Sequence, residues 1–179
     1  DCGAEGSNLK WTLDDAGTLT ISGTGAMANF SSSSNQPWAS NRSKIRTVTI
    51  GGGVTSIGNY AFFDCSGLTS VTIQEGVASI GPDAFANCTG LDYVSIPSSI
   101  NGIGSKAFYS YGNSAEYPDL IKCKYYYGGS PDQWLDIKSD GAFGDWDWAT
   151  ASYMAENYCC FFPTLTCDDS ALPPLPRER

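Results

Sequence analysis

The sequence predicts a β-rich solenoid, because one pattern of apolar residues returns every 23 residues. The first half of the pattern, L-x-x-V-x-I, occurs at 45–50, 68–73 and 91–96, with Ile45 in place of the first Leu. The second half, V-x-x-I-G-x-x-A-F, follows at 54–62, 77–85 and 100–108, with Ile100 in place of the third Val. One such unit cannot bury its own apolar face, whereas a stack of units makes a continuous core.

The spacing within each repeat indicates its local shape. Val71 and Ile73 flank Thr72, so the two apolar side chains point to one side of a strand and Thr72 points to the other. A return path begins at Val77, and Gly81 and Pro82 then suit a tight turn leading into a short helical turn. Strands of successive repeats are expected to pair side by side, about 4.8 Å apart.

The residues before the repeats predict a hairpin over 9–22, in which Asp14 to Gly17 supply the turn and the apolar residues cover the first repeat. A calcium site at Asp14 and Asp15 is the alternative for the paired acids of that turn. The long connection 23–44 is expected to be held against the first repeat by Met27, Phe30, Pro37 and Trp38.

After Phe108 the 23-residue register breaks. Leu120, Cys123 and Tyr125 restore the L-x-x-V-x-I spacing with a shift of six residues, which makes 109–119 an insertion. Ser130, Pro131 and Gln133 form a capping box that predicts a helix start. The following Trp134, Leu135 and Ile137 are expected to face the last repeat, and a final strand is expected within 149–158.

These elements make one predicted domain over 1–179. Its parts are a hairpin cap and loop at 1–44, repeats at 45–127, a C-terminal strand–helix–strand cap at 128–158, and an irregular tail at 159–179.

The 68–90 segment, LTSVTIQEGVASIGPDAFANCTG, resembles the repeats of the BspA-like leucine-rich repeat family of bacterial surface proteins. The segments WTLDDAGTLTISGTGAM at 11–27 and YYYGGSPDQWLDI near 127–137 also look like pieces of that family. The resemblance implies a right-handed leucine-rich-repeat-type solenoid with short helical or 3-10 turns. It also implies a secreted or cell-surface protein that attaches to host matrix proteins, host cells or other bacteria.

Composition argues against two classes of partner. The chain has 19 acidic and 10 basic residues, a net charge of −9, which disfavours binding to nucleic acid and to anionic membranes. No run of about eighteen apolar residues is present, so no membrane-inserted helix is predicted.

The seven cysteines predict structural thiols in the repeats. Cys65 and Cys88 occupy the same repeat position and are expected to be buried and stacked, with a disulfide between them as the alternative. A bridge is more plausible among Cys159, Cys160 and Cys167, and the pairing is not assigned.

The residue types argue against an enzyme and predict no cofactor and no metal site. The sequence has no histidine, which excludes Ser-His-Asp and Cys-His arrangements, and it has no C-x-x-C pair for zinc. Asp145, Asp147 and Glu156 are the candidates for catalysis by two carboxylates, but acidic residues alone do not indicate an enzyme.

The candidate ligand contacts are the outward strand positions and three aromatic residues of irregular segments. A protein partner is the first hypothesis, because repeat proteins bind through extended surfaces. A glycan held by tyrosine or tryptophan rings is the second, and a structural spacer is the third. The candidate residues are Thr49, Ser70, Thr72, Tyr93, Ser95, Tyr111, Tyr117 and Trp146.

Overall fold

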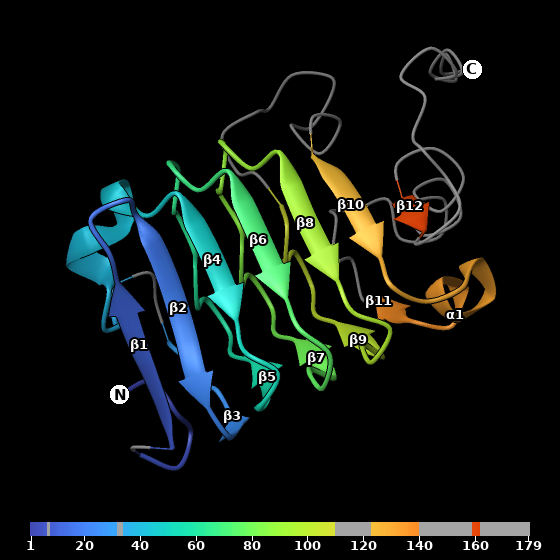
Figure 1. The fold of residues 1–179 in the computed structure, drawn as a ribbon, viewed down its shortest axis with the longest axis horizontal. Helices are drawn as coiled ribbons and strands as arrows, with labels where there is room; N and C mark the ends of the chain where they lie inside the picture. Colours follow the sequence, from blue (N-terminus) through green and yellow to red (C-terminus); the bar gives the residue numbers. More distant parts are fainter. Residues whose placement is uncertain (7, 32–33, 110–122, 140–158, 162–179) are drawn as a thin grey trace.

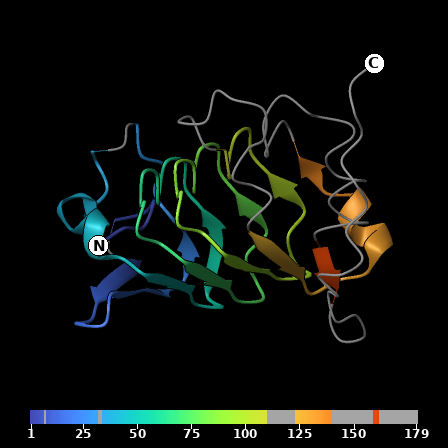
Figure 2. The same ribbon diagram turned by 90° about the horizontal axis from the view of Figure 1, so that it is seen from above.

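The computed structural model describes residues 1–6, 8–31, 34–109, 123–139 and 159–161, whose strands form two sheets (Figures 1 and 2). The seven-stranded sheet has the order β1 (Leu9–Leu13), β2 (Thr18–Gly23), β4 (Thr47–Ile50), β6 (Ser70–Ile73), β8 (Tyr93–Ile96), β10 (Lys124–Tyr127), β12 (Cys159–Phe161). The five-stranded sheet has the order β11 (Lys138–Ser139), β9 (Gly102–Ile103), β7 (Ser79–Ile80), β5 (Val54–Ile57), β3 (Gly25–Ala26). Every pairing is parallel except the β1–β2 hairpin.

The pairing register confirms the 23-residue repeat. Val71 lies opposite both Val48 and Val94, and Ile80 lies opposite both Ile57 and Ile103. All of these side chains are buried, at 2% exposure or less. The return path that the sequence placed after Val77 is itself a strand in each repeat, so the repeats build a second sheet that the apolar pattern alone did not predict.

The predicted helical turns are wrong for the described repeats. Tyr60, Asp83 and Lys106, at one repeat position, have positive φ angles of 55°, 54° and 56°. In the turns of the first two repeats, N–H groups alternate between a carbonyl of the next repeat, as in Phe62 to Ala84 at 2.7 Å, and a carbonyl of the same turn. A helix would direct every N–H along its own axis, so bonding between repeats excludes it.

The repeated glycine has a different role from the one expected. Gly81 has no positive φ, and a methyl group added to it would lie 2.8 Å from the backbone nitrogen of Asn59 in the preceding repeat. Because real Cβ atoms avoid such distances, this position needs glycine for the close approach of successive backbones rather than for a turn.

Large aromatic rings form a column through the core. Phe62, Phe85 and Phe108 stack with centroids 5.0 and 5.3 Å apart, and Trp38 stacks on Phe62 at 5.3 Å. Phe108 meets Tyr125 edge to face at 5.3 Å. Each repeat therefore contributes one ring that contacts both neighbours, as expected for Phe85.

The N-terminal hairpin is confirmed, with Leu9, Leu19 and Ile21 buried and Trp11 and Leu13 partly buried against the core. The Asp14 carboxylate accepts a hydrogen bond from the Thr18 N–H at 2.8 Å, which closes the turn.

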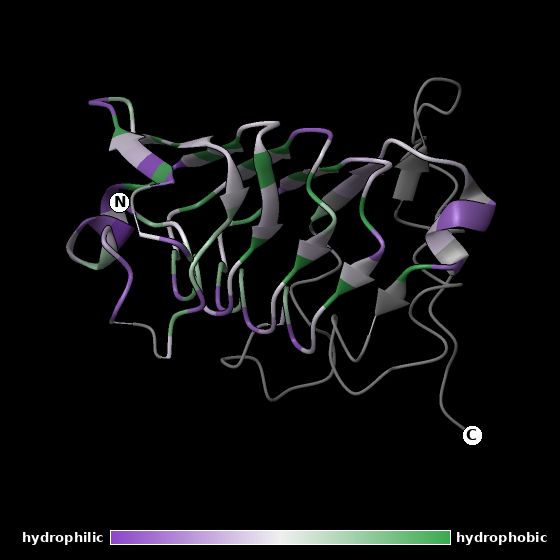
Figure 3. Cartoon of the chain, turned by 90° about the horizontal axis from the view of Figure 1, so that it is seen from below, coloured by the Kyte–Doolittle hydropathy of each residue, from purple (hydrophilic) through white to green (hydrophobic). Residues whose placement is uncertain are grey.

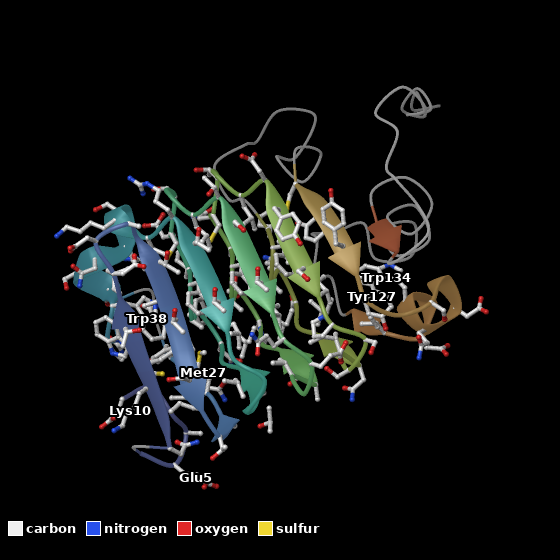
Figure 4. All side chains as sticks on the ribbon, viewed as in Figure 1. Glu5, Lys10, Met27, Trp38, Tyr127 and Trp134 are labelled. Atoms are coloured by element: carbon white, nitrogen blue, oxygen red, sulfur yellow. The ribbon has the colours of Figure 1, made fainter. Side chains whose placement is uncertain are left out.

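The 23–44 connection contains β3 and a 3-10 helix, η1 (Ala39–Lys44), and it binds the first repeat. The Trp38 indole N–H donates a hydrogen bond to the Ala61 carbonyl at 2.9 Å, and the Gln36 side-chain amide donates one to the Tyr60 carbonyl. As expected, Met27 and Trp38 are buried (Figure 4), and Phe30 is partly buried against the core. Pro37, the fourth residue of the expected set, is exposed.

The C-terminal part corrects the register after the insertion. Tyr125 lies opposite Val94 and Tyr127 opposite Ile96, so the shift is eight residues (125 − 94 − 23) rather than six. Tyr125 and Tyr127 are both buried and take the positions that the prediction gave to Cys123 and Tyr125.

Helix α1 (Pro131–Leu135) begins with the predicted capping box, in which the Gln133 N–H donates to the Ser130 hydroxyl at 3.2 Å. Trp134 and Ile137 are buried as expected, and Trp134 lies against Tyr127 with centroids 5.2 Å apart (Figure 4). The expected strand within 149–158 lies outside the described residues. The first three residues of the expected irregular tail, 159–161, form strand β12 instead, which pairs with β10.

Among the described residues, no helix has the length and apolar character needed to cross a membrane.

Candidate functional site

The outward-pointing residues of β2, β4, β6 and β8 form one surface, called the outer face. Parallel pairing aligns them in two rows across the strands. One row is Thr18, Thr47, Ser70 and Tyr93; the other is Thr20, Thr49, Thr72 and Ser95. All eight side chains are half-buried, whereas the residues between them along each strand are buried. The structure thus brings five of the predicted contact residues, Thr49, Ser70, Thr72, Tyr93 and Ser95, onto one surface.

An aromatic pair borders the outer face on the C-terminal side. Tyr126 of β10 lies opposite Ser95 in the register, and its ring centroid is 4.8 Å from that of Tyr93, with the planes inclined by 33°. The sequence prediction missed Tyr126 because it placed Tyr125 two positions away in the register. The alternation of buried Tyr125 and Tyr127 around half-buried Tyr126 was the signal that could have found it.

The remaining predicted contacts cannot be joined to this surface. Tyr111, Tyr117 and Trp146 lie outside the described residues, as do the carboxylates Asp145, Asp147 and Glu156. The outer face is therefore built here from strand residues alone.

Charge is absent from the eight outward positions of β2, β4, β6 and β8 and lies at the strand ends instead. Arg46 and Asp92 precede β4 and β8, and Glu75 follows β6; all three are exposed. In Figure 3 the strongly hydrophilic residues lie mainly in the turns and in α1 (Figure 3). The outer face is thus a neutral, hydroxyl-rich surface on a chain with a net charge of −9.

Glu75 links the ends of β6 and β8. Its carboxylate accepts hydrogen bonds from the Ser98 N–H at 2.9 Å, the Ser98 hydroxyl at 3.0 Å and the Ser99 N–H at 3.2 Å. The slight desolvation of this exposed carboxylate opposes ionisation, but the hydrogen bonds outweigh it and lower the pKa of the Glu75 carboxyl below its ordinary value. Glu75 is therefore a structural link between repeats at the margin of the outer face.

The cysteines of the described repeats are buried thiols. Cys65 and Cys88 are free, which confirms the expected burial without a disulfide, and the Cys88 thiol donates to the Phe62 carbonyl at 3.2 Å. Burial raises the pKa of Cys65 to about 12 and raises that of Cys88 well above its usual range. In the part of the chain that the structure describes, no group of three or more acidic, histidine or cysteine side chains is arranged to hold a metal ion.

The parallel sheets built by a sequence repeat define a leucine-rich-repeat-type fold. Residues 36–120 match the family described as BspA type leucine-rich repeat region (6 copies). No curated protein sequence matches the chain significantly.

Several solved bacterial structures are similar to the chain. A leucine-rich repeat protein from Eubacterium ventriosum has 25% identity and a TM-score of 0.48, over 72% of this chain and 44% of that one. One from Bacteroides ovatus has 19% identity and a TM-score of 0.45, over 76% of this chain and 37% of that one. A leucine-rich cell surface protein from Faecalibacterium prausnitzii has 17% identity and a TM-score of 0.34, over 76% and 42%. The chain thus spans less than half the length of these three proteins.

Proposed function

We propose that this chain is a non-enzymatic interaction module of a secreted or cell-surface bacterial protein, and that it binds a partner protein through the outer face. The proposal includes residues 1–179 working as one domain, in which the hairpin and the α1 region close the two ends of a right-handed solenoid. The match of residues 36–120 to the BspA-type family supports the bacterial-surface setting.

The observation that carries the proposal is the Tyr93–Tyr126 pair at the end of a neutral hydroxyl surface. Tyrosine supplies a large amphipathic contact at a low entropic cost, and serine and threonine supply adaptable hydrogen bonds around it. Binding energy in protein interfaces is concentrated in such aromatic anchors. The parallel sheet holds these side chains in fixed rows, so little order is lost on binding.

A binding assay with immobilised, purified extracellular matrix proteins tests the proposal. We expect one or more of them to bind the chain, and Tyr93→Ala or Tyr126→Ala to weaken binding at least about tenfold. Tyr109→Ala is the matched control, because Tyr109 is also half-buried but directly follows the turn of the third repeat and belongs to no strand of the outer face.

The same variants distinguish the other functions. If the chain binds a glycan array but no matrix protein, and Tyr93→Ala abolishes the glycan binding, the partner is a sugar and not a protein. No binding in either assay would favour a spacer. Equal loss in all three variants would show that the effect does not come from the outer face.

A further inference from the structure

Strand β1 leaves backbone hydrogen-bonding groups open at one edge of the seven-stranded sheet. Residues 8 and 14 direct their backbone groups toward the β2 side, through bonds from the Thr24 N–H to the Asn8 carbonyl and from the Asp14 N–H to the Thr18 carbonyl. The alternation of an antiparallel pair then directs the N–H and C=O of Leu9, Trp11 and Leu13 away from β2.

Only the first part of this edge is covered. The Cys2 N–H donates to the Leu9 carbonyl at 3.0 Å. Within the described ranges no strand lies beyond β1, and no backbone group bonds to Trp11 or Leu13 on this side. Two N–H donors and two carbonyl acceptors are therefore available, in the arrangement that another strand requires.

The side chains at this edge are matched in a way that suits a second copy of the strand. Trp11 and Leu13 face the core side but are only partly buried, with the Trp11 ring edge-on to Trp38 at 6.0 Å. Lys10, labelled in Figure 4, and Thr12 alternate with them and are exposed, as is Asp14 at the end of the strand (Figure 4).

We propose that β1 pairs antiparallel with β1 of a second copy of this chain, with the two Thr12 residues opposite each other. This register places Trp11 opposite the partner's Leu13 and Lys10 opposite the partner's Asp14, because each pair of residue numbers sums to 24. All four open backbone groups of each copy are used, and the Cys2–Leu9 bond is left intact.

Three features favour a second copy of this chain as the partner of β1. The contact is isologous, so every interaction occurs twice about the two-fold axis. Each copy offers a cation where the other offers an anion, and the aromatic and aliphatic side chains gain a cross-strand neighbour. The two outer faces then lie in one continuous sheet, so a dimer would offer two copies of the proposed binding surface and gain avidity for a repeated partner.

Sedimentation velocity of residues 1–179 tests the association. We expect a reversible dimer at concentrations around 100 μM or below. Lys10→Glu should weaken it at least about tenfold, because the introduced carboxylate then meets the partner's Asp14. Mixing Lys10→Glu with Asp14→Lys should restore a heterodimer, because each new charge then meets its opposite. Lys106→Glu, which makes the same charge change in the third repeat, should leave the dimer unchanged.

Oxidative cross-linking tests the register. Opposed residues at a non-hydrogen-bonded position have Cα atoms about 4.5 Å apart, within the range of a disulfide. Thr12→Cys should therefore give a covalent dimer on mild oxidation, above the background of the unmodified chain. Thr72→Cys, on the outer face in the middle of the sheet, should give background only.

A chain that remains monomeric throughout the concentration range would overturn the proposal. A dimer that Lys10→Glu does not weaken, or one in which Thr12→Cys cross-links no better than Thr72→Cys, would overturn it too. None of these three results would bear on the partner assay, because a monomer could still bind through its outer face.

Discussion

At the residue scale, the three stacked phenylalanines show how one repeated side chain joins successive repeats. Phe85 is 1% exposed and its ring contacts Phe62 on one side and Phe108 on the other. Because both neighbours are themselves fixed in the column, the core has little freedom to collapse around a missing ring.

We therefore expect Phe85→Ala to lower the free energy of unfolding by about 3–5 kcal/mol, measured by denaturant titration. Thr72→Ala, half-buried on the outer face, should change it by about 0.5 kcal/mol or less. A comparable effect of the two substitutions would contradict the assignment of inner and outer faces.

At the scale of elements, neighbouring strands are joined by side chains in the turns as well as by their ladders. Gln74 accepts a hydrogen bond from the Gly52 N–H at 3.0 Å, toward the preceding repeat. Glu75 accepts hydrogen bonds from Ser98 and Ser99, in the following repeat. Two adjacent residues after β6 thus hydrogen-bond this turn to the corresponding turns of the preceding and the following repeat.

The Glu75 link predicts a pH dependence. A carboxyl with a lowered pKa in the folded state contributes stability above its unfolded pKa, and this contribution is lost as the pH falls through the folded value. Glu75→Gln should therefore lower the free energy of unfolding modestly at neutral pH, by less than about 1 kcal/mol for an exposed site. The difference from the native chain should shrink below the ordinary glutamate pKa of 4.5.

Thermal unfolding of both chains across this pH range measures the effect. Glu5→Gln is the matched control, since Glu5 is exposed at the N-terminal end of the fold (Figure 4). A gap between Glu75→Gln and the native chain that stays constant through acid pH would show that ionisation of Glu75 is not the cause.

At the scale of the whole molecule, the repeats share one core, so its parts should open together. Cys65 and Cys88 lie in successive repeats and are buried, at 0% and 9% exposure. Burial also raises the pKa of Cys123, beside the last described repeat strand, to about 12. Reactive thiolate is consequently scarce in the folded chain at mildly alkaline pH.

Alkylation followed by peptide mass spectrometry measures this cooperativity. We expect Cys65 and Cys88 to stay unmodified in the native chain and to become modified at the same denaturant concentration as global unfolding. Modification of Cys88 well before Cys65 would indicate that the repeats open one at a time, as in a weakly coupled array.

The sequence by itself determined the parts of the fold that follow from side-chain periodicity. A fixed interval of 23 residues places Val48, Val71 and Val94 in one buried row, because only one register buries every apolar residue. The same reasoning predicted the Thr and Ser rows of the outer face, and local chemistry predicted the hairpin and the capping box of α1.

Tertiary structure alone decided what depends on contacts between repeats. The left-handed residues at Tyr60 and Asp83 exist because N–H groups bond to the next repeat, which no local propensity encodes. The place of Tyr126 beside Tyr93 depends on the register resumed after an insertion, where three successive tyrosines satisfy more than one alignment. Periodicity specifies which side of a strand each residue occupies, whereas packing against a neighbour selects the partner it meets.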